Sequence, residues 1–328
     1  EFGGNSAVTR EEACLYALNM LKATCVTYDG LSIDVSTGDS NVSINNTKAY
    51  KVENTGATDG NIYIAGYTGG KDGFMQFAEE HFTALKMGAA ASTDEFGRPA
   101  NSWTYKNVTV GTYGVQADFT YTAKMYSNSD SPSTKLSKLG LKGYKLAEQN
   151  ESKQFTEYYV NGEQKSAGTL DEVVDIVELT ANGAKVEVFV SDTNADEIIA
   201  VVVTNTYLAQ IDRISTSSKT VKLTAMDPSK NISLTVTEDD DVYAGLSQMK
   251  ADDYVLVTYT AKSGSKVVAS YSVPEVVTGS LTKLANDKSS LTVGGTSYNV
   301  AEKATAISDL NSTSLSSKQE CKLFLDSY

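Results

Sequence analysis

The chain has 328 residues and a net charge of −13, with a pI of about 4.6. An acidic surface of this kind repels the phosphates of nucleic acids and the anionic headgroups of membranes, so we expect neither as a partner. Hydrophobic residues make up 41% of the chain, which is enough for several small cores and excludes a fully disordered protein. No apolar run reaches the roughly 18 residues of a membrane-spanning helix.

The N-terminal region, residues 7–117, has mixed helix and strand patterns. Apolar residues at helical spacing predict a helix over Val8–Thr24, where Thr9 and Glu12 form a capping box. A second apolar stripe predicts a helix over Asp72–Met87. Between them, Leu31–Gly60 alternates weakly and predicts a β meander or hairpin, with a further short strand at 62–64.

Residues 118–205 have the pattern of a β domain. The expected features are, in chain order, a strand at Phe119–Met125, a loop at Ser127–Lys138, a strand at Leu139–Lys145, a hairpin turn at Asn161-Gly162 and a hairpin formed by Val186–Val190 and Ile198–Val203. The last hairpin resembles the end of the units that follow, so we interpret this region as a diverged copy of them.

The last third of the chain repeats one β pattern. Residues 206–275 and 276–328 each contain a short opening strand, a polar turn, two alternating strands, a connector with a leucine (Leu246; Leu310) and a final strand. The chain ends where this pattern calls for one more turn and strand, and it begins abruptly, so we expect it to be part of a longer protein. The predicted fold is mainly β, with an α+β N-terminal region followed by small β-sandwich or barrel domains in an elongated array.

Two segments resemble surface-layer proteins. Thr9, Arg10 and Glu12, followed by the apolar helix Ala13–Leu21, resemble the last helix of an S-layer homology (SLH) motif, although the earlier part of that motif is absent. The segment Asp94–Lys106, with Gly111-Thr-Tyr113 and the β repeats, is similar to the region that follows the anchoring motifs in surface-layer proteins of gut Firmicutes. The first helix either belongs to an anchoring motif or caps the first β domain.

The resemblance implies a non-catalytic structural component of a bacterial cell surface, located outside the cell at the wall. The implied partners are other copies of the protein, in a lattice, and a cell-wall polymer bound through SLH motifs outside this chain. The alternative is an adhesin-like module that binds a glycan or a host protein.

No motif predicts catalysis. His81 is the single histidine, and the three cysteines, Cys14, Cys25 and Cys321, have neither zinc-ligand spacing nor a nucleophile signature around them. An odd number of cysteines cannot all pair within one chain, so we interpret them as buried thiols. We expect no cofactor and no enzymatic activity.

Two groups of residues are candidates for binding. The acidic run Glu238, Asp239, Asp240 and Asp241 offers oxygen ligands for calcium but lacks the EF-hand order, so a solvated turn is the simpler interpretation. Trp103, Tyr105 and Tyr113 offer an aromatic platform for a sugar, but a lone Trp is more often a core residue, here at the junction with the first β unit.

Overall fold

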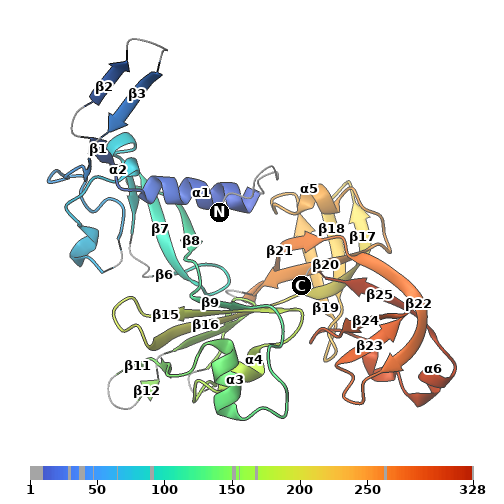
Figure 1. The fold of residues 1–328 in the computed structure, drawn as a ribbon. Coiled ribbons are helices and arrows are strands. Elements are labelled where there is room, and N and C mark those ends of the chain that lie inside the picture. The colour runs from blue at the N-terminus through green and yellow to red at the C-terminus, as the bar shows by residue number, and fades with distance from the viewer. Residues whose placement is uncertain are drawn as a thin grey trace. The chain divides into compact units, whose positions relative to one another are not determined.

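The computed structural model describes residues 10–28, 31–36, 41–46, 48–64, 66–88, 92–149, 153–154, 156–166, 169–261 and 264–326. The protein is mainly β, with several separate sheets and a few short helices (Figure 1), which confirms the predicted fold class. Two compact units divide the chain: Glu1–Thr93 with Pro99–Val115, and Asp94–Arg98 with Gln116–Tyr328. We call them the N-terminal and the C-terminal unit.

The N-terminal unit combines two helices with small sheets. Its elements are α1 (Arg10–Lys22), β1 (Val26–Tyr28) paired with β4 (Ala49–Lys51), the hairpin β2 (Leu31–Ser36) and β3 (Asn41–Asn46), the 3-10 turn η1 (Thr68–Gly70), α2 (Phe77–His81), and a sheet of β5 (Leu85–Met87), β6 (Ser92–Thr93), β7 (Pro99–Tyr105) and β8 (Val108–Gly114). The predicted first helix and the predicted hairpin are both present, whereas Thr9 lies outside the described residues.

The predicted second helix is mostly wrong. Only Phe77–His81 is helical, and the end of the predicted range, Leu85–Met87, is a strand that pairs with β7. Met87 faces Trp103 in that pairing, and both are buried in one cluster with Ile62 and Ala78. Burial against a neighbouring strand therefore overrides the helical spacing of the apolar residues. The strand expected at 62–64 is reduced to one bridge between Ile62 and Met87.

Helix α1 packs less completely than its apolar pattern suggests. Leu21 contacts the buried cluster around Trp103, but Leu15, Tyr16, Leu18 and Met20 are exposed. The sequence therefore predicted where this helix lies in the chain but not which of its faces is covered.

The C-terminal unit begins with a mixed sheet. Its elements are β9 (Phe119–Tyr121), α3 (Pro132–Leu139), β10 (Lys145–Leu146), the pair β11 (Glu148–Gln149) and β12 (Lys153–Gln154), β13 (Glu157–Val160), β14 (Glu163–Gln164), α4 (Asp175–Leu179), β15 (Ala184–Val190) and β16 (Glu197–Asn205). The strand order is β14-β13-β16-β15-β9, and β13 and β10 run parallel to β16. The predicted final hairpin is confirmed by β15 and β16.

Neither helix of this sheet domain, α3 or α4, was predicted. The segment expected to be a loop and then a strand contains α3, whose N-terminus is capped by Ser131 accepting the Thr134 N–H, with Pro132 in the first turn. Gly140 ends the helix with a left-handed φ of 75°. These caps are visible in the sequence, so the loop and strand predictions at 127–145 are wrong for a local reason.

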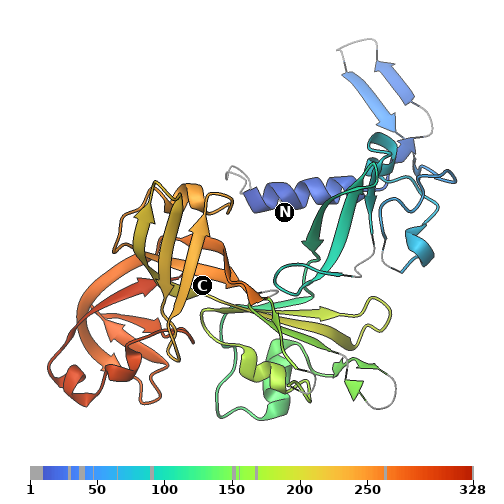
Figure 2. The same ribbon diagram turned by 180° about the vertical axis from the view of Figure 1, so that it is seen from behind.

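The two C-terminal repeats share the order of four strands. The first contains β17 (Tyr207–Ser215), β18 (Thr220–Ala225), β19 (Ile232–Thr237), α5 (Tyr243–Leu246), β20 (Tyr254–Thr260) and β21 (Val267–Ser272), in the order β19-β18-β17-β20-β21. The second contains β22 (Glu275–Leu284), β23 (Ser290–Val293), β24 (Thr296–Asn299), η3 (Ile307–Asp309), α6 (Ser312–Ser316) and β25 (Glu320–Leu325), in the order β24-β23-β22-β25. Figures 1 and 2 show the two sheets in yellow to orange and in red.

The likeness between the repeats extends to single residues. Strand β17 is bulged after Ile211, and β22 is bulged after Leu281. The Ile211 N–H donates to the Asp253 carbonyl and the Leu281 N–H to the Gln319 carbonyl, both at 2.9 Å. In both repeats the connector ends in a left-handed residue, Asp252 or Lys318. Because bulges are specific features of a sheet, their shared position supports a true repeat.

The sheet at 118–205 shares only part of this plan. Strands β9, β15 and β16 pair in the same order as β17, β20 and β21 of the first repeat. In both domains a short helix, α4 or α5, comes directly before the final hairpin. The hairpin of β13 and β14 lies on β16, on the far edge, instead of extending from the opening strand. The parallel pairing of β13 is the physical reason that the front half does not align with the repeats.

Candidate functional site

The second repeat leaves an opening where the first repeat is closed. In the first repeat, β21 pairs with β20 and lies against β19, so it closes the curved sheet. In the second repeat, β25 is the counterpart of β20, and β24 is the counterpart of β19. Within the described residues, no strand pairs with the other edge of β25. We call the opening between β24 and β25 the seam.

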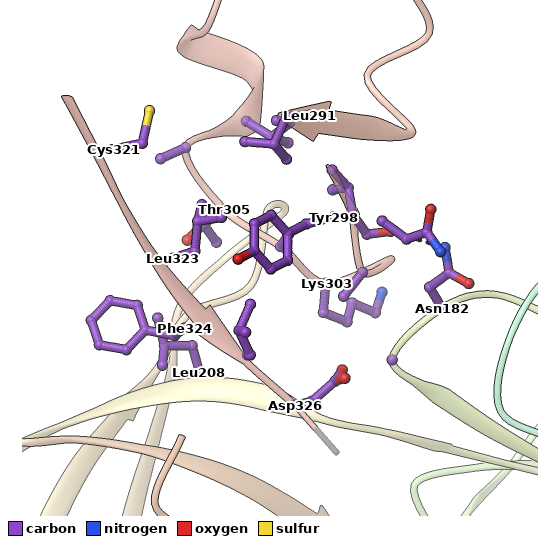
Figure 3. Close-up of a pocket in the computed structure, with 18 of the residues that line it drawn as sticks. Asn182, Leu208, Leu291, Tyr298, Lys303, Thr305, Cys321, Leu323, Phe324 and Asp326 are labelled. Carbon is purple, nitrogen blue, oxygen red and sulfur yellow. Dashed lines mark hydrogen bonds between the residues drawn. The ribbon is translucent and has the colours of Figure 1, made fainter. Parts of the chain in front are cut away.

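A pocket of about 670 Å³ occupies the seam. Its walls come from β24, from the connector 300–310, from β25, and from the facing residues Thr122, Asn182, Gly183, Leu208 and Leu256. Figure 3 shows Tyr298 standing in the opening beside β25, with Lys303, Asn182 and Asp326 toward one end. The volume lies in the range of ligand-binding pockets in general.

The apolar face of β25 is only partly covered. Its register on β22 matches that of β20 on β17, so Cys321, Leu323 and Leu325 correspond to Val255, Val257 and Tyr259. The residues of the first repeat are 0%, 1% and 7% exposed, whereas all three of the second are only half-buried. The seam is thus the uncovered part of a core that the first repeat completes with Val268 and Tyr271.

The opposite face of β25 is held in place by the first repeat. The rings of Phe324 and Tyr254 lie 4.7 Å apart, and the Lys322 ammonium lies over both rings. At one end of the pocket, the Glu302 N–H donates to the Asn182 carbonyl at 2.8 Å. The ring contacts join β25 to the first repeat, and the Glu302 bond joins the connector 300–310 to Asn182.

The candidate aromatic platform is divided between core and surface. Trp103 is 8% exposed and packs in the buried cluster of the N-terminal unit, while Tyr105 and Tyr113 are exposed on β7 and β8. Because the Trp103 ring faces the core, it is not presented to a sugar. Two exposed tyrosines remain of the three candidates.

The acidic run 238–241 forms a turn with its own partners. The Glu238 carboxylate pairs with Lys219, and the Asp240 carboxylate accepts the Thr237 N–H at 2.6 Å and the Thr237 hydroxyl at 3.0 Å. Asp239 and Asp241 lie in the same turn. Across the part of the chain that the structure describes, no group of three or more His, Cys, Asp or Glu side chains could hold a metal ion.

One buried carboxylate with four hydrogen-bond donors was not identified from the sequence. Glu79 in α2 is 1% exposed, and its two oxygens accept N–H groups from Asn54 Nδ2 at 2.9 Å, from the backbone of Gly60 at 3.2 Å and Ile62 at 3.3 Å, and from Gln76 N at 3.2 Å. This carboxylate joins α2 to the segment before it, which is a structural role. The sequence signal was only the capping-box spacing of Gln76 and Glu79.

His81 and the cysteines show no nucleophile arrangement. The His81 ring lies 4.4 Å from that of Phe77, and its Nε2 lies 3.9 Å from a Glu80 oxygen. Burial, and next the hydrogen bond that its thiol donates to Glu80, raise the pKa of Cys25 to about 11. Burial also raises the pKa of Cys321. A raised pKa disfavours the thiolate that nucleophilic chemistry needs.

Comparisons with protein-family models, with curated proteins and with solved structures each gave no match. Among the helices that the structure describes, none is long and apolar enough to cross a membrane.

Proposed function

We propose that this protein is a non-catalytic structural component of a bacterial cell surface, of the surface-layer type. The observation that carries the proposal is the pair of β repeats that share the order of four strands, the same bulge and the same connector ending. Repeated small β units whose described acidic clusters serve turns and caps are suited to spacing and assembly.

The proposal includes a location outside the cell and two kinds of partner. Other copies of the protein would form the lattice, and a wall polymer would be bound through SLH motifs outside this chain. The net charge of −13 supports this setting, because an acidic protein stays soluble at high local concentration until specific contacts form.

Electron microscopy of the purified protein, dialysed to rising concentration with and without calcium, tests this proposal. Ordered sheets or filaments would support a surface-layer component. Particles that stay dispersed under every condition would contradict it.

The second candidate function is an adhesin-like binding module. It is favoured by the pocket of about 670 Å³ and by the exposed Tyr105 and Tyr113. Binding on a glycan array that is lost in the double variant Tyr105→Ala, Tyr113→Ala, with the unfolding midpoint unchanged, would favour it over the lattice role.

A further inference from the structure

We infer that the C-terminal unit contains a binding site for a short turn, and that the chain's own residues Asp94–Arg98 are the ligand that fills it. We call this ligand the strap and its binding site the socket. The strap belongs to the C-terminal unit, although Thr93 and Pro99 on either side of it belong to the N-terminal unit. It holds the sheet domain 118–205 to the first repeat, and the inference does not depend on the proposed surface role.

The strap is a turn that its own contacts organise. The Asp94 Oδ1 accepts the N–H groups of Phe96 and Arg98, both at 2.9 Å, and the Asp94 Oδ2 accepts the Arg98 Nε–H at 2.6 Å. Gly97 has a left-handed φ of 88°, which glycine adopts without strain. A ligand that is already folded loses little conformational freedom when it binds, so the strap is well suited to act as one.

The socket consists of Tyr159, Gly162, Glu187 and Thr260. Gly97 of the strap lies against the Tyr159 ring, and a Cβ atom at this glycine would overlap the ring. Tyr159 is 8% exposed, and its hydroxyl donates to the Glu157 carboxylate at 3.0 Å, so the ring has little freedom to move away. A Cβ atom at Gly162 would likewise overlap the carbonyl oxygen of Glu95 in the strap. The close approach therefore needs one glycine in the strap and one in the socket.

The strap contacts both of the β domains that meet at this junction. Tyr159 lies on β13 of the sheet domain, and the hydroxyl of Thr260, at the end of β20 in the first repeat, donates to the Glu95 carbonyl. The next residue, Ala261, donates its N–H to the Asn161 carbonyl at 2.7 Å, which joins the same two domains directly. The strap thus reinforces a junction that is otherwise made by few main-chain bonds.

The charge of Arg98 matches that of the socket. The Arg98 Nη1 lies 3.9 Å from the Glu187 Oε1, and Glu187 is 6% exposed. The Lys185 Nζ lies 2.7 Å from the same oxygen. Because a buried carboxylate is costly without cationic partners, the socket favours a turn that carries an arginine directly after its glycine.

The test starts from Gly97→Ala, which adds a Cβ atom at a left-handed φ and against the Tyr159 ring, so the strap of this variant no longer fits the socket. The probe is a fluorescent peptide of residues 92–100, cyclised end to end, because Ser92 and Ala100 are paired in the hairpin of β6 and β7. Its binding to the whole chain is followed by anisotropy. We expect Gly97→Ala to bind the peptide at least about tenfold more tightly than the wild-type chain, in which the strap competes for the socket.

Two altered peptides provide matched controls. The peptide that carries Gly97→Ala should bind at least about tenfold more weakly than the unaltered peptide, because its Cβ atom meets the Tyr159 ring. The peptide that carries Glu95→Ala should bind like the unaltered one, since Thr260 is bonded to the Glu95 carbonyl and this residue is exposed. Equal binding of all three peptides would overturn the inference.

Hydrogen exchange at the Ala261 amide reports the junction itself. Exchange should be faster in Gly97→Ala than in the wild-type chain, and the cyclic peptide should slow it again. The inference is wrong if the peptide does not bind Gly97→Ala, if it binds the wild-type chain equally well, or if exchange at Ala261 is the same in both chains. Should Gly97→Ala fail to fold, Arg98→Gln replaces it with the same expected and contrary results, because it keeps the glycine and removes the cation beside Glu187.

Discussion

The buried carboxylate of Glu79 provides the sharpest stability prediction for the N-terminal unit. Its Oε1 accepts the N–H groups of Gly60 and Ile62, and its Oε2 accepts those of Asn54 and Gln76. In Glu79→Gln, one oxygen becomes an NH₂ group, so two of these donors face another donor whichever way the amide turns.

The expected cost follows from the two lost bonds. Hydrogen bonds to a charged group are worth about 1.5–3 kcal/mol each, so the free energy of unfolding of this unit should fall by about 3–6 kcal/mol. At about 4–8 °C per kcal/mol for a domain of this size, the melting temperature should fall by at least about 12 °C.

Trp103 makes the measurement selective, because it is the only tryptophan of the chain and lies in the cluster with Ala78, next to Glu79 in α2. Urea unfolding followed by its fluorescence therefore reports the N-terminal unit. Glu80→Gln is the matched control, since this side chain is 51% exposed, and it should change stability by less than about 1 kcal/mol. A loss below about 1 kcal/mol in Glu79→Gln, or an equal loss in the control, would refute the reasoning.

Three further predictions concern other parts of the chain. Asn161→Ala removes the hydrogen bond that Asn161 donates to the Tyr207 hydroxyl at 3.0 Å and the one that it accepts from the Asn205 N–H at 2.9 Å, and it places Ala at a left-handed φ. Chemical denaturation should therefore show that the free energy of unfolding falls by about 2–4 kcal/mol. A fall of less than about 1 kcal/mol would contradict the stabilising role of Asn161. Leu246 is fully buried in the closed first repeat, so Leu246→Ala should lower the free energy of unfolding by about 2–5 kcal/mol in the same measurement. Leu310 is only partly buried beside the seam, so Leu310→Ala should lower it by less than half as much. Equal losses in the two variants would mean that the seam is closed. Alkylation of Cys25 needs its thiolate, so with a pKa of about 11 the rate of alkylation should rise about tenfold per pH unit from pH 8 to pH 10. Glu80→Gln removes the carboxylate that accepts the thiol's hydrogen bond and should raise this rate. A rate that reaches a plateau by pH 9.5 would contradict the raised pKa.

The repeats were predictable because their cause is local. Alternating residues in β18 and β19, the short apolar run in β20 and the turn residues between them define strands whatever their neighbours are. The Asn161-Gly162 turn was equally predictable, since both residues adopt the left-handed φ values of a two-residue hairpin, 48° and 78°. The end of the predicted second helix could not be corrected in this way, because Met87 is a strand residue only through its pairing with Trp103.

The candidate sites depend on long-range contacts, which the sequence does not encode in any short motif. Glu79 acquires its donors from residues 17 to 25 positions away as well as from Gln76. The seam follows from the folding that brings β24 and β25 to the walls of one pocket, which no short motif in the sequence specifies. Trp103 was named as both a platform and a core residue, and only its burial distinguishes the two.

The measurement that tests the structural role most directly is small-angle scattering of the purified chain over a concentration series, with and without calcium. The account predicts a forward scattering per unit mass that rises with concentration or with calcium, as copies assemble. A constant value for a monomer across the whole series would contradict the lattice role and favour the binding module.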